Sequence, residues 1–130
     1  MGQEEKNIKV LVVDDSAINR HVLIEYLKIK DVVCDEVEDG EQALTYLQGN
    51  KPDVILLDLI MPVMDGFEVL DILKKQGNTI PVIVITAYLK GNTFQRCKEL
   101  GAAGFLNKPV KMQELYNLIS QVLDQGNANL

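Results

Sequence analysis

Short apolar runs alternate with helix-patterned segments five times along this chain, and this alternation constrains the fold more than any other feature. Hydrophobic periodicity predicts strands over residues 8–13, 32–37, 54–57, 81–86 and 103–106, and helices over residues 17–29, 41–48, 66–76, 92–100 and 112–123. Nearly continuous apolar strands separated by helices are typical of a parallel sheet that is covered on both faces. The sequence therefore predicts an α/β protein.

The order of the strands follows from general rules of chain connection. Right-handed crossovers that place helices on both faces give a doubly wound sheet, and 2-1-3-4-5 is a common order for five strands. The second predicted strand is the most polar, which suits an edge position. We expect a flavodoxin-like (βα)5 three-layer sandwich built on a five-stranded parallel sheet. The length of 130 residues, without a repeat or linker, predicts one domain over residues 1–130 with its core at about 8–123.

Carboxylates follow the ends of two strands that this order makes neighbours. Asp14 and Asp15 come directly after the first strand, and Asp58 comes directly after the third. Ligands of such sheets bind outside the carboxyl ends of the strands, at the point where the strand order reverses. Three acids this close repel one another unless a cation is bound or a reaction uses them. Because Mg²⁺ prefers oxygen ligands, the cluster predicts a magnesium site.

Two further polar residues end strands on the same rim. Thr86 closes the fourth strand, and Lys108 follows the fifth. A phosphoryl group at this rim would find Mg²⁺, the Lys108 ammonium and the Thr86 hydroxyl around its oxygens. Phosphoryl transfer depends on this kind of positioning and charge neutralisation. Asp58 would then be the nucleophile that forms an acyl phosphate.

Four ordered motifs carry a resemblance to a known family. They are Asp14-Asp15-Ser16, the nine-residue run Asp-Leu-Ile-Met-Pro-Val-Met-Asp-Gly from Asp58 to Gly66, Thr86-Ala87 and Lys108-Pro109. In order and separation, the set resembles the receiver domain of two-component response regulators, of the chemotaxis-regulator type. The resemblance covers about residues 8–123. The pair Asp65-Gly66 is interpreted as turn and helix-cap chemistry rather than as part of catalysis.

The resemblance implies a role for each residue of the rim. The implied roles are Asp58 as phosphoacceptor, Asp15 as a direct metal ligand, Asp14 as a ligand through a metal-bound water, the Ile60 backbone carbonyl as a further metal ligand, and Thr86 and Lys108 as the phosphoryl-binding side chains. The implied cofactor is Mg²⁺, with Mn²⁺ as a substitute. The family also has a cis peptide after the lysine, so we expect Lys108-Pro109 to be cis.

Switching and lifetime are implied in the same way. In the family, the hydroxyl residue moves toward the phosphoryl group and an aromatic residue turns inward, which here assigns the switch to Thr86 and Phe105. Two variable positions tune the lifetime of the phosphoryl group, and they correspond to Ile60 and Tyr88. An apolar side chain and a large aromatic at these positions favour slow hydrolysis.

The implied partners are proteins. The phosphoryl donor would be a histidine kinase or a histidine phosphotransfer protein. The phosphorylated chain would act on a downstream effector protein or domain. The first helix is expected to face the sheet with Asn19, Val22, Leu23, Tyr26 and Leu27. Ile18 and Ile24 fall outside this stripe and are candidates for contact with the donor's histidine-bearing helix. The expected output surface comprises Tyr88, Leu89, Phe105, Val110, Met112 and Tyr116.

Composition excludes several other classes of function. The net charge of -6 argues against a direct nucleic-acid partner, because that affinity comes chiefly from basic residues. Residues 1–6 are unlike a signal peptide, and no apolar run approaches the ~20 residues that span a bilayer. Cys34 and Cys97 show no metal or disulfide spacing and are expected to be free thiols. We therefore expect a cytoplasmic protein with no membrane partner.

Three alternatives to a signalling phosphoacceptor fit the sequence less well. An aspartyl-phosphate phosphatase would need a second acid two residues after its nucleophile, where this chain has Ile60. A flavodoxin-like nucleotide binder would need glycines and hydroxyls after the first strand, where Asp14 and Asp15 repel a phosphate. The intact set of site residues argues against an interaction module that works without phosphate.

The expected protein is therefore not an enzyme with an external substrate. It catalyses only its own phosphorylation and a slow autodephosphorylation. Two contexts stay open, a stand-alone regulator and a receiver that is part of a hybrid kinase or larger regulator. The start at Met1 with a short polar lead favours the stand-alone form.

Overall fold

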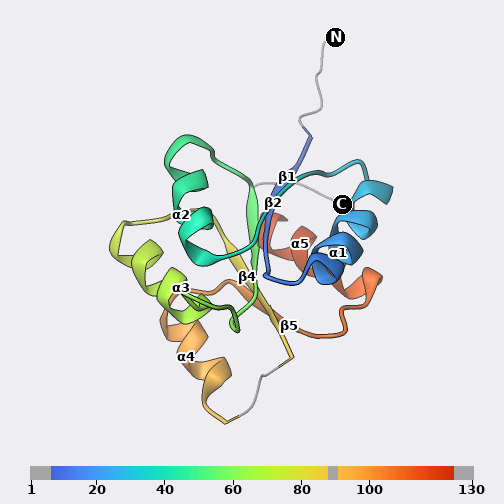
Figure 1. Ribbon diagram of the computed structural model, residues 1–130. Coiled ribbons are helices and arrows are strands. Elements are labelled where there is room, and N and C mark those ends of the chain that lie inside the picture. Colours follow the sequence, from blue (N-terminus) through green and yellow to red (C-terminus); the bar gives the residue numbers. More distant parts are fainter. Residues whose placement is uncertain (1–6, 88–90, 125–130) are drawn as a thin grey trace.

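The computed structural model describes residues 7–87 and 91–124, which form a sheet between two layers of helices (Figure 1). The elements in chain order are β1 (Lys9–Val13), α1 (Ala17–Ile29), β2 (Val33–Val37), α2 (Gly40–Gly49), β3 (Val54–Leu57), α3 (Gly66–Lys75), β4 (Val82–Thr86), α4 (Thr93–Glu99), β5 (Gly104–Asn107) and α5 (Met112–Leu123). Each lies where the hydrophobic pattern placed it, with ends that differ by at most about two residues.

The sheet has the predicted order, β2-β1-β3-β4-β5, and every neighbouring pair is parallel. In the pairing of β1 with β3, Val13 lies opposite Leu57. The next residue along each strand is Asp14 and Asp58, respectively. The register therefore brings both carboxylates to the same point of the rim, where the strand order reverses.

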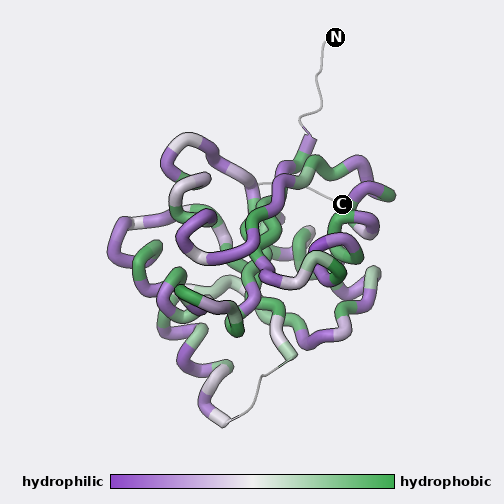
Figure 2. Tube along the Cα trace, in the orientation of Figure 1, coloured by the Kyte–Doolittle hydropathy of each residue, from purple (hydrophilic) through white to green (hydrophobic). Residues whose placement is uncertain are grey.

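Alternate residues of the strands enter two separate apolar clusters, one on each face of the sheet. Leu11 of β1 packs in the cluster that α2, α3 and α4 cover, and Val12 packs in the cluster beneath α1 and α5. The same division of helices is visible in Figure 1. Figure 2 shows hydrophobic residues along the central strands and hydrophilic residues mainly on the outer turns. The three-layer sandwich is confirmed.

The expected sheet-facing stripe of α1 is partly wrong. Leu23 and Leu27 are buried as predicted, but Val22 is 38% exposed, and Ile24 packs against the core instead. The buried face of the helix therefore includes Ile24 and excludes Val22. The period of the apolar residues predicts that one face is buried, but the tilt of the helix on the sheet decides which borderline residue joins it.

Side-chain caps fix the starts of α1 and α3, and the sequence suggested the one at Asp65-Gly66. The Ser16 hydroxyl accepts a hydrogen bond from the Asn19 N–H at 3.2 Å at the start of α1. At the start of α3, Asp65 and Glu68 form a reciprocal capping box. Within residues 7–87 and 91–124, no helix has the length and apolar character needed to cross a membrane.

Candidate functional site

The acidic cluster forms as predicted at the carboxyl ends of β1 and β3. Backbone bonds fix both positions, since the Asp14 N–H donates to Val37 O at 3.3 Å and the Asp58 N–H donates to Val13 O at 3.0 Å. Asp14 and Asp58 are 2% and 6% exposed, whereas Asp15 faces solvent. One carboxylate oxygen from each of the three acids lies within 4.8 Å of the others. The site is therefore buried on the side of the sheet and accessible to solvent on the side of Asp15.

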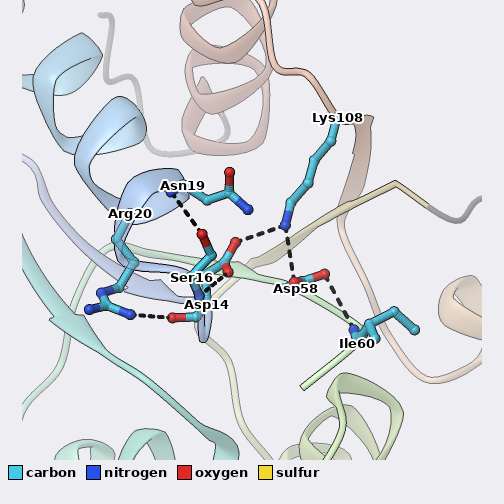
Figure 3. A network of polar contacts seen from close by, with 7 residues as sticks. All are labelled: Asp14, Ser16, Asn19, Arg20, Asp58, Ile60 and Lys108. Carbon is cyan, nitrogen blue, oxygen red and sulfur yellow. Dashed lines mark hydrogen bonds and ion pairs between the residues drawn. The ribbon is translucent and has the colours of Figure 1, made fainter. Parts of the chain in front are cut away.

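Lys108 reaches across the cluster from the end of β5 (Figure 3). Its Nζ lies 2.9 Å from Asp14 Oδ2 and 3.0 Å from Asp58 Oδ2. Its backbone N–H donates to Thr86 O at 3.1 Å, which ties the lysine to the end of β4. Thr86 itself is fully buried. The structure thus brings Lys108 into direct contact with two of the acids and holds Thr86 on the neighbouring strand.

Burial and charge act in opposite directions at this site. Burial raises the pKa of Asp58 above its usual value, and the nearby Asp14 adds to the rise, although the hydrogen bonds and charge of Lys108 oppose it. Burial lowers the pKa of Lys108, but its hydrogen bonds to Asp14 and Asp58 outweigh this effect, and the pKa is raised overall. Lys108 is therefore an ammonium ion at neutral pH.

The donor set suits a hard divalent cation. All three side chains offer carboxylate oxygens, and Mg²⁺ takes such ligands while keeping several waters. A cation here would also stabilise the carboxylate of Asp58, whose pKa is raised by burial and, to a lesser extent, by the nearby Asp14. The Ile60 N–H donates to Asp58 Oδ1 at 3.3 Å. The role expected of the Ile60 carbonyl stays a prediction.

Gly66 has a function that the sequence interpretation missed. Its N–H donates to Leu59 O at 2.9 Å, and a Cβ at this position would lie 2.5 Å from the carbonyl oxygen of Asp58. Helix α3 can begin this close to the end of β3 only because the residue has no side chain. The sequence marks Gly66 as helix-cap chemistry, but the close approach to Asp58 appears only in three dimensions.

The loop between β3 and α3 also contains an unusual backbone turn. Val63 has a φ of 69°, and the Met64 N–H donates to Pro62 O at 2.7 Å across it. This is the hydrogen-bond pattern of a three-residue γ-turn, which is rare with a positive φ at its centre. A β-branched residue in this region is an outlier, because its side chain crowds the backbone. The loop that follows Asp58 thus carries local strain.

A second missed residue is Arg20, one turn into α1. Its guanidinium donates from Nη1 to the Asp14 backbone carbonyl at 2.8 Å and from Nε to Glu36 Oε1 at 2.7 Å. Figure 3 shows the first of these bonds beside the Asp14–Lys108–Asp58 contacts. The sequence offers no local signal for it, since Glu36 lies 16 residues away.

The other sequence expectations have mixed outcomes. The cis peptide at Lys108-Pro109 is confirmed, and Ile18 is exposed beside the acidic rim. The assignment of Tyr116 to an output surface is wrong, because its ring is buried and its hydroxyl donates to the Tyr26 carbonyl at 2.5 Å. Tyr88 and Leu89 lie outside the described residues.

Phe105, the expected switch aromatic, lies on β5 and is partly buried. Its ring centroid is 4.3 Å from that of Phe94 on α4, with the rings tilted by 46°. Such tilted pairs are a favourable aromatic arrangement. The contact connects β5 to the outer surface of α4, where Phe94 is exposed.

Comparison with known proteins gives a consistent result. The sequence pattern of the response regulator receiver domain matches residues 10–120. The chemotaxis protein CheY of Halobacterium salinarum is 30% identical over 115 residues, which are 88% of this chain and 96% of that protein. The sensor histidine kinase RcsC of Salmonella typhi is 38% identical over 109 residues, which are 84% of this chain but only 12% of the kinase.

Among solved structures, the receiver domain of a sensor histidine kinase from Pseudomonas aeruginosa PAO1 is similar, with a TM-score of 0.80 and 29% identity. The alignment covers 89% of this chain and 97% of that domain, whose structure has a magnesium ion coordinated in the active site cleft.

Proposed function

The chain belongs to the family of response regulator receiver domains, and from this premise we propose that it accepts a phosphoryl group from a phosphohistidine protein onto Asp58. The observation that carries the proposal is the arrangement of Lys108 between two buried acids, with a third acid at the open side. Buried acids and a lysine held together in this way are costly for stability, so they indicate a chemical role.

In this proposal an Asp58 carboxylate oxygen attacks phosphorus, and the new O–P bond forms while the P–N bond of the phosphohistidine breaks. The electron pair of the broken bond returns to the imidazole nitrogen. Mg²⁺ bound by Asp14, Asp15, Asp58 and the Ile60 carbonyl would supply positive charge beside the transferring group. The Lys108 ammonium is placed to move from a carboxylate oxygen to a phosphoryl oxygen. The Thr86 hydroxyl is proposed as the second phosphoryl-binding group.

Phosphorylation would then change a surface that a partner reads. We assign the switch to Thr86 and Phe105, which lie on neighbouring strands of the sheet. The donor is a histidine kinase or a histidine phosphotransfer protein, and the acceptor of the signal is an effector protein or domain rather than nucleic acid or membrane. Residues 1–130 act as one receiver domain that turns over no external substrate and hydrolyses its own acyl phosphate slowly.

A test of the proposal uses acetyl phosphate as a small phosphoryl donor with Mg²⁺, followed by intact mass. We expect the parent protein to gain one phosphoryl group, and we expect no gain with EDTA or in the variant Asp58→Ala. Asp71→Asn is the matched control, because Asp71 is an acid on α3 whose partner is Lys75 and not the site. An unmodified parent protein, or an Asp58→Ala variant that still gains mass, would contradict the assignment of Asp58.

A further inference from the structure

Arg20 has an environment that is unusual for an arginine near a cation site. Its side chain is only 12% exposed, and it does not contact a carboxylate of the metal cluster in the bonds that the structure shows. Instead, Nη1 donates to the backbone carbonyl of Asp14 at 2.8 Å (Figure 3). That carbonyl belongs to the peptide group that joins Asp14 to Asp15, the two acids that follow β1.

A bond to this carbonyl restrains both acids together. The peptide group is planar, so fixing its oxygen fixes the direction in which the chain leaves Asp14 and enters Asp15. The Asp14 carboxylate is already held by the Ser16 N–H at 2.9 Å and by Lys108 at 2.9 Å. Asp15 is exposed, so the direction of its carboxylate depends more strongly on the backbone.

The guanidinium is itself held from the opposite side. Its Nε donates to Glu36 Oε1 at 2.7 Å, and Glu36 lies in the edge strand β2, opposite Val12 in the register with β1. Arginine is suited to this task because its planar group presents several donors in a fixed geometry. The bonds thus connect β2, α1 and the loop that carries two of the metal-binding acids.

We propose that Arg20 is a positioning residue for divalent-cation binding, acting through the Asp14–Asp15 peptide and anchored by Glu36. The inference rests on the proposed function in one respect, namely that Asp14, Asp15 and Asp58 bind Mg²⁺. Charge and geometry make opposite predictions for Arg20. As a positive charge near a cation it weakens Mg²⁺ binding, whereas as a positioning residue it strengthens it.

The test measures Mg²⁺ affinity by isothermal titration calorimetry on the unphosphorylated protein. In Arg20→Gln we expect affinity to fall about tenfold, the size expected when one hydrogen bond from a charged donor is lost. Arg20→Lys keeps the net charge but lacks the planar set of donors, and we expect it to bind more weakly than the parent as well. Lys28→Gln is the matched control, because it removes one positive charge from the exposed last turn of the same helix, and its affinity should not fall.

Unchanged or tighter binding of Mg²⁺ by Arg20→Gln would overturn the proposal, since that is the result of a charge effect alone. If Arg20→Gln does not fold, as judged by circular dichroism, Arg20→Lys decides the question, and affinity equal to that of the parent overturns the proposal. A parent protein that binds no Mg²⁺ would overturn both this role of Arg20 and the magnesium site of the proposed function.

A second readout separates positioning of the cation from a general loss of structure. The rate of phosphorylation by acetyl phosphate in Arg20→Gln should be low at limiting Mg²⁺ and should approach the parent rate at saturating Mg²⁺. A rate that stays low at saturating Mg²⁺ would contradict a role confined to cation binding.

Discussion

At the residue scale, the electrostatics of Asp58 dominate the site. Burial raises its pKa, Asp14 adds repulsion, and the two hydrogen bonds from Lys108 and Ile60 reduce the rise without cancelling it. The folded protein therefore keeps a carboxylate in surroundings that disfavour its charge. A bound cation or a covalently attached phosphoryl group with its counter-ions would relieve this situation. Stability and chemistry thus compete at one side chain.

The substitution Asp58→Asn should make the protein more stable at neutral pH. Because the folded-state pKa of Asp58 lies above the unfolded value of about 4, the folded state binds the proton more tightly, and its free energy of unfolding falls as pH rises through the folded pKa. The amide does not ionise in this pH range. The free energy of unfolding of the variant should therefore exceed that of the parent at pH 7 and approach it near pH 3.

Urea denaturation of both proteins without divalent ions, at several pH values, measures this difference. Asp71→Asn, which removes an acid on α3 that pairs with Lys75, is the control and should not show the same gain at neutral pH. A parent protein more stable than Asp58→Asn at pH 7 would show that the Lys108 contact outweighs burial.

Val63 offers a second prediction at this scale, on strain in the active-site loop. Its φ of 69° is costly for a β-branched residue, while asparagine is several-fold enriched among residues with positive φ. The side chain is 79% exposed, so little buried surface is lost on replacement. We expect Val63→Asn to raise the free energy of unfolding by about 1 kcal/mol. Asp31→Asn, at a φ of 58°, is the control, and its stability should change little when measured in the same urea titration.

The third prediction concerns the lifetime of the phosphoryl group. The Ile60 side chain is 60% exposed and offers no polar group to orient an attacking water. An amide at this position can hold such a water, so we expect Ile60→Asn to hydrolyse its acyl phosphate severalfold faster than the parent. Loss of phosphate is followed by intact mass after removal of acetyl phosphate. Val63→Asn places the same side chain on the same loop as a control. Equal hydrolysis rates in Ile60→Asn and the parent would contradict the assignment.

At the scale of elements, the sequence was sufficient wherever a local pattern decides the structure. The apolar runs predicted the five strands, Asp65-Gly66 predicted a helix cap, and the alternation of strands and helices predicted the sheet order. The three acids could be grouped because the strand order places the ends of β1 and β3 side by side.

Features that depend on contact between distant segments could not be predicted from the local sequence pattern. Val22 is exposed and Ile24 packs against the core, opposite to what the period of the apolar residues predicted. Tyr116 is buried, and its hydroxyl donates to the Tyr26 carbonyl, 90 residues earlier in the chain. Arg20 meets its partners only once β1, β2 and α1 are assembled. A one-dimensional pattern contains none of these pairings.

The approach of α3 to the acceptor strand gives a prediction at this scale. In Gly66→Ala the new Cβ would lie 2.5 Å from the Asp58 carbonyl oxygen, so either the helix or the strand end must move. We expect the free energy of unfolding to fall by about 2 kcal/mol, as for other overpacked sites. Phosphorylation by acetyl phosphate should also slow, because Asp58 is displaced.

Gly49→Ala is the matched control for this variant. Gly49 lies in the last turn of α2, and a Cβ there meets nothing within 4 Å. Its stability should match or slightly exceed that of the parent, because alanine is the better helix former, and its rate of phosphorylation should be unchanged. If Gly66→Ala behaves in the same way as Gly49→Ala, the close approach does not constrain the acceptor.

At the scale of the whole molecule, the site and the surface of α4 are joined through the sheet. Thr86 pairs with Asn107 and Val84 with Phe105 in the register of β4 and β5. Phe105 in turn contacts Phe94, whose ring is exposed on α4. In the proposed switch, a change at Thr86 would reach the outer surface through Phe105 and its contact with Phe94. Coupling of this kind biases two packings that differ by a few kcal/mol.

Phe105→Ala tests this connection. The side chain does not contact the acids or Lys108 in the contacts that the structure shows, so phosphorylation of Asp58 should proceed as in the parent. The response of α4 should weaken, because the ring that bears against Phe94 is gone. Hydrogen exchange of α4 amides, with and without beryllofluoride and Mg²⁺, measures this response. We expect the beryllofluoride-induced shift between the two populations of α4 to be at least about fivefold smaller in the variant.

Phe67→Ala is the control, since that ring also contacts α4, through Arg96, but lies on α3 away from β5. Because both variants remove one aromatic contact from α4, a response lost equally in both would indicate general loosening of the helix, whereas a loss in Phe105→Ala alone places the coupling in β5.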